Sequence, residues 1–205
     1  MYQIINQHCN LVIDAALDPE GYLQLCTDLR SSTVSVVNDP DFQRRYRNYW
    51  QMNAARLGAP FYGRYFQVLS DRLRSGNCDV AAIVDDLTEV SNGKVQFSFA
   101  TKLANMIDQR MPIYDSFVAD FYFYDAPTDK SIADRIRKYL AFHEFLRFEY
   151  ERVIRQRLLD PAIAAVRARY STCATVCDER IIDWLIWGAV TLLRRQVQQG
   201  RCVYQ

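Results

Sequence analysis

Two side chains within residues 95–122 (VQFSFATKLANMIDQRMPIYDSFVADFY) have types and spacing that suit nucleophilic chemistry. Lys102 lies in a predicted helix, residues 96–107, with apolar residues on both sides of it. A lysine attacks only when it is deprotonated, and its free pKa is about 10.4, so a site must desolvate it or supply a base. Asp115 stands where the N-cap of the next helix belongs, and the positive end of a helix dipole keeps such a carboxylate ionised. An ionised aspartate there could stabilise a cationic transition state or help to deprotonate the amine.

The backbone between these two side chains favours a bend. Met111-Pro112 requires an extended backbone. A helix, an extended turn and a second helix that starts antiparallel could therefore bring Lys102 and Asp115 together. Each residue also has a purely structural interpretation, Lys102 as a snorkelling side chain on a buried helix and Asp115 as a helix cap. The sequence leaves both interpretations open.

Apolar residues recur at helical spacing along most of the chain, which predicts an all-α fold. Asp39-Pro40 has the residue types of an N-cap followed by a first helical position. The length suits one domain or two small helical lobes with a cleft near residues 95–122. An extended connector is predicted at residues 31–38 and a loop at 171–177. Helices are predicted at residues 4–17, 20–30, 40–56, 61–74, 79–90, 96–107, 116–123, 130–159, 162–170 and 179–199.

The composition is that of a soluble globular protein, with 50% apolar and 24% charged residues. A net charge of +1 provides no overall field that would attract nucleic acid or membrane, so any basic surface must be local. The N-terminus lacks the basic start and long apolar run of a signal peptide. No uninterrupted apolar stretch reaches the roughly 20 residues that span a bilayer. We therefore expect a cytoplasmic protein with no membrane partner.

The six cysteines are scattered, and only Cys173 and Cys177 are close in sequence. A single C-x3-C pair, with His8 and His143 far away, is a poor zinc signature. We interpret all the cysteines as reduced thiols and predict neither a metal nor a cofactor. His143, on a long predicted helix, is interpreted as a packing or surface residue. The cysteines not yet named are Cys9, Cys26, Cys78 and Cys202.

One local basic bias is present in residues 40–74. Its arginines outnumber the acids of the same two helices, Asp41 and Asp71. They indicate either a face that contacts phosphates or a solvated face that pairs with acids elsewhere in the chain. The arginines are Arg44, Arg45, Arg47, Arg56, Arg64, Arg72 and Arg74.

Two short segments carry a resemblance to a known superfamily. Thr101-Lys102-x-Ala104 and Pro112-Ile113-Tyr114-Asp115 resemble the lysine and aspartate motifs of the helix-hairpin-helix DNA glycosylases, which include 8-oxoguanine DNA glycosylase. From about residue 42 to residue 187 the chain is also similar to an uncharacterised bacterial group with F-A-(S/T)-K-L and P-(I/V)-x-D motifs. The chain differs from the superfamily at residues 98–100, where Ser-Phe-Ala replaces the glycine turn whose N–H groups approach DNA phosphates.

The resemblance implies a function and a role for each residue of the site. Lys102 would attack the sugar C1′ as a Schiff-base nucleophile, and Asp115 would assist expulsion of the base. A damaged base would be flipped out of DNA into the site. Phe99, Tyr114 or Tyr122 would stack on it. The phosphate contacts would come from Arg44, Arg45, Arg47 and Arg64.

Two hypotheses of different classes follow. The first is a DNA-base glycosylase, with or without Schiff-base lyase activity, whose partner is DNA. The second is a non-enzymatic helical module that keeps the fold without the chemistry and binds DNA or a protein. We also interpret Trp184 and Trp187, in the apolar middle of the last predicted helix, as core residues.

Overall fold

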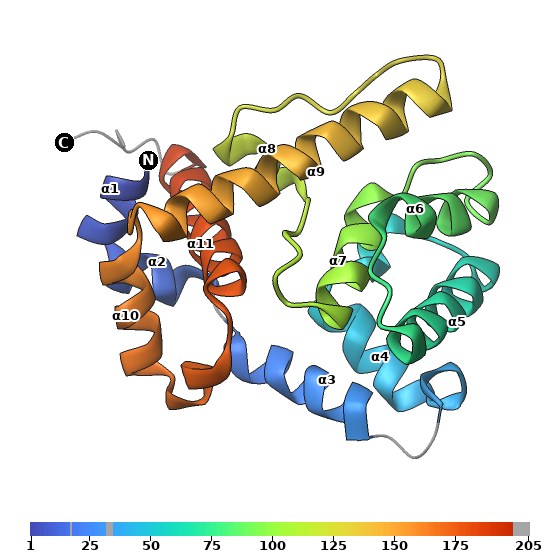
Figure 1. The fold of residues 1–205 in the computed structure, drawn as a ribbon, viewed down its shortest axis with the longest axis horizontal. Helices are drawn as coiled ribbons and strands as arrows, with labels where there is room; N and C mark the ends of the chain where they lie inside the picture. Colours follow the sequence, from blue (N-terminus) through green and yellow to red (C-terminus); the bar gives the residue numbers. More distant parts are fainter. Residues whose placement is uncertain (17, 32–34, 199–205) are drawn as a thin grey trace. The chain divides into compact units, whose positions relative to one another are not determined.

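A computed structural model describes residues 1–16, 18–31 and 35–198, and these contain helices and no strand (Figure 1). The predicted all-α class is therefore confirmed for the described residues. The α-helices are α1 (Tyr2–Gln7), α2 (Cys9–Ala16), α3 (Pro19–Ser31), α4 (Pro40–Tyr49), α5 (Ala59–Ser75), α6 (Val80–Glu89), α7 (Phe97–Ile107), α8 (Ser116–Phe121), α9 (Ile132–Arg155), α10 (Asp160–Arg169) and α11 (Asp178–Gln198). The short 3-10 helices are η1 (Val36–Asn38), η2 (Met52–Ala55) and η3 (Ser171–Thr175).

The chain divides into two compact units. The first unit comprises Met1–Pro19, Pro112–Ala126 and the chain from His143 onward. The second comprises Glu20–Met111 and Pro127–Phe142. Each unit is assembled from segments that are distant in sequence, and one boundary, at Met111-Pro112, falls inside residues 95–122.

The first unit is built around α11, whose middle is almost completely buried. Helix α11 packs against α2 and α8. At Gly188 the helices α11 and α2 are in close contact, because a Cβ placed there would lie 2.4 Å from the backbone oxygen of Val12. This contact requires a residue without a side chain. The buried residues of α11 include Ile181, Ile182, Leu185 and Ile186.

The second unit has an aromatic core formed by α4 and α5. Tyr46 and Tyr65 are fully buried, and their hydroxyl groups share a hydrogen bond of 2.9 Å. Phe42 and Phe66 pack edge to face, with ring centroids 6.4 Å apart. Helix α7 packs beside α6 and also contacts α5. Buried rings thus hold the helix that carries Lys102.

Three predicted helix starts are confirmed by their caps. Asp39 accepts the backbone N–H of Phe42 at 2.9 Å, with Pro40 at the first helical position. Asp79 and Asp115 each accept two backbone N–H groups at the starts of α6 and α8. Because four N–H groups at a helix start have no partner within the helix, an aspartate at this position stabilises it by about 1 kcal/mol.

Other predicted boundaries were wrong. The helix predicted at residues 4–17 is two helices, since the backbone of His8 (φ −118°, ψ 26°) departs from helical geometry. The helix predicted at 40–56 ends at Tyr49, and Gln51 and Arg56 adopt left-handed conformations. The helix predicted at 130–159 ends at Arg155, shortly before the left-handed Arg157.

Two connecting segments also differ from the prediction. Part of the connector predicted as extended, residues 31–38, is the 3-10 helix η1, and part of the loop predicted at 171–177 is η3. Leu17, residues 32–34, Gln199 and Gly200, which also entered the predictions, lie outside the described residues.

The described cysteines are all free thiols, while Cys202 lies outside the described residues. None of the helices in the described part of the chain has both the length and the apolar character needed to cross a bilayer.

Candidate functional site

Lys102 occupies a half-buried position on α7, a helix made mostly of buried residues. Its Nζ donates a hydrogen bond to the backbone oxygen of Trp50 at 3.3 Å. The same nitrogen lies 5.9 Å from the ring centroid of Trp50 and 5.6 Å from that of Phe99. The amine is therefore bounded by two aromatic rings and a carbonyl group, which is a partly desolvated setting.

Asp115 caps α8 as predicted, and both of its oxygens accept hydrogen bonds. Oδ1 accepts the backbone N–H groups of Phe117 at 2.9 Å and Val118 at 3.0 Å. Oδ2 accepts the indole Nε1–H of Trp187 at 3.0 Å. These donors occupy three of the roughly four lone-pair positions of a carboxylate, so the group is fixed in orientation and keeps some accepting capacity.

The backbone just before Asp115 is held at two successive residues. His143 Nε2 donates to the backbone oxygen of Pro112 at 2.9 Å. The backbone N–H of Ile113 donates to Oδ1 of Asp183 at 3.3 Å, and the Tyr150 hydroxyl donates to the same oxygen at 2.6 Å. Together with the hydrogen bond from Trp187 to Asp115, these contacts fix the turn that precedes α8.

Two of these supporting groups are buried and ionisable. Burial lowers the pKa of His143 to about 4, so near neutral pH the ring is uncharged and carries its proton on Nε2. Burial raises the pKa of Asp183 to about 7, against the opposing effects of Arg180 and the hydrogen bond from Tyr150. Asp183 Oδ2 lies 3.6 Å from an Arg180 nitrogen, which is too far for a hydrogen bond.

The two proposed reactive residues belong to different units. Lys102 lies in the second unit, and Asp115 lies in the first. The contacts described above for Lys102 and for Asp115 are all made within the unit to which each residue belongs.

The three residues predicted to stack on a base lie in three different environments. Phe99 is 8% exposed, and its ring centroid lies 5.9 Å from that of Phe61. Tyr114 is 7% exposed and packs edge to face with Tyr124. Tyr122 is half-buried, and its hydroxyl group shares a 2.8 Å hydrogen bond with the hydroxyl of a second tyrosine, Tyr2.

The arginines predicted to contact phosphates are mostly engaged within the second unit. Arg44 pairs with Asp41 at 2.9 Å, and Arg45 pairs with Asp28. The guanidinium carbon of Arg47 lies 4.8 Å from the centroid of the Tyr62 ring.

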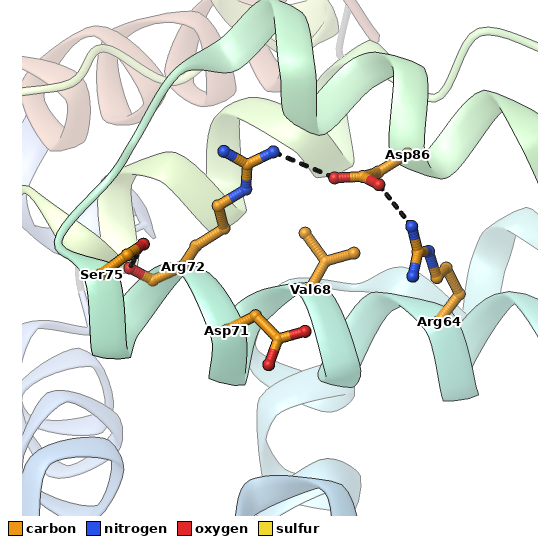
Figure 2. Close-up of a pocket in the computed structure, with 6 residues that line it drawn as sticks. All are labelled: Arg64, Val68, Asp71, Arg72, Ser75 and Asp86. Carbon is orange, nitrogen blue, oxygen red and sulfur yellow. Dashed lines mark hydrogen bonds and ion pairs between the residues drawn. The ribbon is translucent and has the colours of Figure 1, made fainter.

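The remaining predicted arginine, Arg64, belongs to a small charged cluster on α5 and α6. Figure 2 shows Arg64 and Arg72 approaching the Asp86 carboxylate from opposite sides. The cluster lines a depression of about 290 Å³ that also includes Asp71. Two arginines and two aspartates cancel in formal charge, so this depression offers little net attraction for an anion.

The segment that corresponds to the glycine turn of the resemblance lies inside α7. The backbone N–H groups of Phe99 and Ala100 both donate to the backbone oxygen of Gln96 at 3.1 Å. These two N–H groups are thus used to start a helix.

The described residues contain no group of three or more His, Cys, Asp or Glu side chains that could hold a metal ion. No protein-family model matches the chain, and no curated protein or solved structure matches it either.

Sequence reasoning missed the residues that hold Asp115. Asp183 and Trp187 are four positions apart, which places them on one face of α11. His143 and Tyr150 are seven positions apart and share a face of α9. The sequence signal for a structural role was a polar residue within the apolar stripe of each helix. That signal does not identify the partners, because they lie more than thirty residues away in the sequence.

The bond between Trp187 and Asp115 should be measurable as a coupling energy. Trp187→Phe removes the indole donor and keeps a ring to pack against Phe117, whose centroid lies 4.6 Å away. We expect urea denaturation of the two single variants, Trp187→Phe and Asp115→Ala, and of the double variant to give a coupling of about 1.5 kcal/mol. A coupling close to zero would show that the indole does not hold the carboxylate.

Proposed function

We propose that the chain is a DNA-base glycosylase with Schiff-base lyase activity, in which Lys102 is the nucleophile and Asp115 the charge-stabilising carboxylate. The observation that carries the proposal is the setting of the Lys102 amine, half-buried between a carbonyl oxygen and two rings. A lysine side chain held by a hydrogen bond to a fixed carbonyl and packed against two rings has a defined orientation, which favours attack by its nitrogen on a correctly placed electrophile. The resemblance of the two sequence motifs supplies the substrate class.

The chemistry assigns a distinct task to each residue. The Lys102 nitrogen forms a bond to C1′ while the bond from C1′ to the base breaks. The base leaves with the bonding electrons and takes up a proton, and opening of the sugar ring then gives an imine. Positive charge develops on the sugar during this step, and an ionised carboxylate with fixed donors stabilises it without having to reorganise. The hydrogen bonds to Asp115 meet that requirement.

Borohydride trapping on a panel of lesion-bearing duplexes tests the proposal. Borohydride reduces the imine and leaves a covalent adduct between protein and DNA. We expect an adduct with the unmodified chain, none with Lys102→Ala, and a normal yield with Lys130→Ala, which changes an exposed lysine outside the site. Asp115→Asn should slow adduct formation by about 100-fold or more. Failure to trap Lys102 on any lesion would refute the proposal.

A second candidate function is a non-enzymatic helical module that binds DNA or a protein. It is favoured by the hydrogen bonds of the Phe99 and Ala100 N–H groups to Gln96, because these groups are then not available to a phosphate. Binding by such a module would not depend on the Lys102 amine. A salt-dependent gel shift that Lys102→Ala retains, with no trapped adduct, would support this function.

A further inference from the structure

A cavity of about 420 Å³ lies in the second unit, outside the site described above. Part of its wall comes from residues 55–58, which precede α5, and from the first turn of α5. The rest comes from residues within the 90–96 segment, which joins α6 to α7. Sites for small molecules in proteins usually measure about 300–1,000 Å³, so the cavity is large enough for one.

The charged side chains that line this cavity are both positive. They are Arg56 and Lys94, and both are exposed. Among the described residues, no aspartate or glutamate lines the cavity, and none forms an ion pair with Arg56 or Lys94. Other arginines of the same unit, such as Arg44 and Arg64, are neutralised by aspartates. The cavity therefore retains a positive charge that the described part of its own unit does not compensate.

Two helices begin at the cavity wall and add to this charge. Gly58 is the N-cap of α5 and Gln96 is the N-cap of α7, and both residues line the cavity. Neither position is capped by a side-chain hydrogen bond. The start of a helix carries the equivalent of roughly half a positive charge, so an anion in the cavity would be stabilised by both helices.

The rest of the wall combines apolar surface with amide groups. Leu57 and Val90 are half-buried and provide the accessible apolar part, while Phe61, only 2% exposed, packs behind it. Asn92 and Gln96 contribute side-chain amides. We propose that this cavity binds a small organic anion, with a carboxylate or phosphate head near the two cations and an apolar body against Leu57 and Val90.

A small ligand suits the cavity better than a nucleic acid backbone does. Duplex binding relies on many cations that contact successive phosphates, whereas this site offers two. The proposal goes beyond the glycosylase function and does not involve Lys102. A Lys102→Ala variant should therefore bind the small anion as well as the unmodified chain does.

Titration of the full chain, followed by the NMR signals of the Asn92 and Gln96 side-chain amides, tests the proposal. The probes are 2-naphthoate, which carries a carboxylate on an apolar body, and adenosine 5′-monophosphate, which carries a phosphate. We expect saturable shifts with at least one of them and weaker binding of inorganic phosphate. Arg56→Gln and Lys94→Gln should each weaken binding about tenfold. Arg137→Gln is the matched control, because it changes an exposed arginine that pairs with Asp134 in the same unit and lies outside the cavity.

The outcomes separate this proposal from the others. A response to only one probe would still support the site and would identify the head group. The absence of saturable shifts, or binding that neither cavity variant weakens, would overturn it. Loss of duplex affinity in the cavity variants without binding of either probe would also overturn it and would assign the cavity to a nucleic acid surface. Borohydride trapping with the Arg56→Gln variant measures the proposed glycosylase activity independently of anion binding in the cavity.

Discussion

Gly188→Ala is expected to destabilise the first unit by about 3 kcal/mol. The added methyl group would lie 2.4 Å from the backbone oxygen of Val12 and 3.0 Å from its Cγ1 atom. A flexible side chain could move away, but a backbone oxygen within α2 can move only if the whole helix shifts. Because α2 and α11 form a main packing contact of this unit, the shift would loosen its core.

Gly63→Ala is the matched control for this prediction. Gly63 also lies inside a long helix, α5, but a Cβ at that position meets no atom within 4 Å. This change should stabilise the protein by roughly 0.5–1 kcal/mol, since alanine loses less backbone entropy than glycine on folding. Urea denaturation of both variants gives the two free energies of unfolding. Equal effects of the two substitutions would contradict the close packing of α2 on α11.

The fold could be predicted from the sequence where the signals are local. Asp39 and Asp115 were each identified as helix caps because an aspartate at such a position accepts the first N–H groups of a helix. The interruptions at His8, Gln51 and Arg56 were missed. These residues are not glycine or proline, so no residue type marks the change of backbone conformation, and the surrounding tertiary structure determines it.

The candidate site could be predicted less completely. The positions of Lys102 on a buried helix and of Asp115 at a helix start follow from neighbouring residues, and the structure has both. The bonds that α11 adds at Asp115 and at Ile113 come from residues about seventy positions away in the sequence. The pairing of the arginines with Asp28 and Asp86 depends in the same way on other helices. Such contacts require knowledge of which helices are neighbours.

The last prediction concerns the two buried ionisable groups behind Asp115, whose effects on stability have opposite signs. His143 has a pKa of about 4 in the folded state against an ordinary 6.5, so the stability it contributes is present above pH 6.5 and is lost as the pH falls toward 4. Asp183 has a pKa of about 7 against an ordinary 3.8. Its contribution is therefore present below about pH 4 and is lost as the pH rises through 7.

The two contributions are similar in size and should largely cancel in the unmodified chain. At about 1.4 kcal/mol for each pKa unit, they amount to roughly 3 kcal/mol for His143 and roughly 4 kcal/mol for Asp183. Asp183→Asn keeps an oxygen to accept the bonds from Tyr150 and Ile113 and no longer titrates, so only the His143 effect remains. We expect the free energy of unfolding of this variant to rise between about pH 4 and 6.5.

His143→Gln should reveal the opposite dependence. Its amide can still donate to the backbone oxygen of Pro112, and the free energy of unfolding should then fall as the pH rises from about 4 to 7. The slope is the informative quantity, because Asp183→Asn also changes the interaction with the buried Arg180 and so shifts stability at every pH. Carboxylates elsewhere contribute equally to all three proteins. Parallel pH profiles for the unmodified chain and the two variants would refute the assignment of opposing charges to these buried groups.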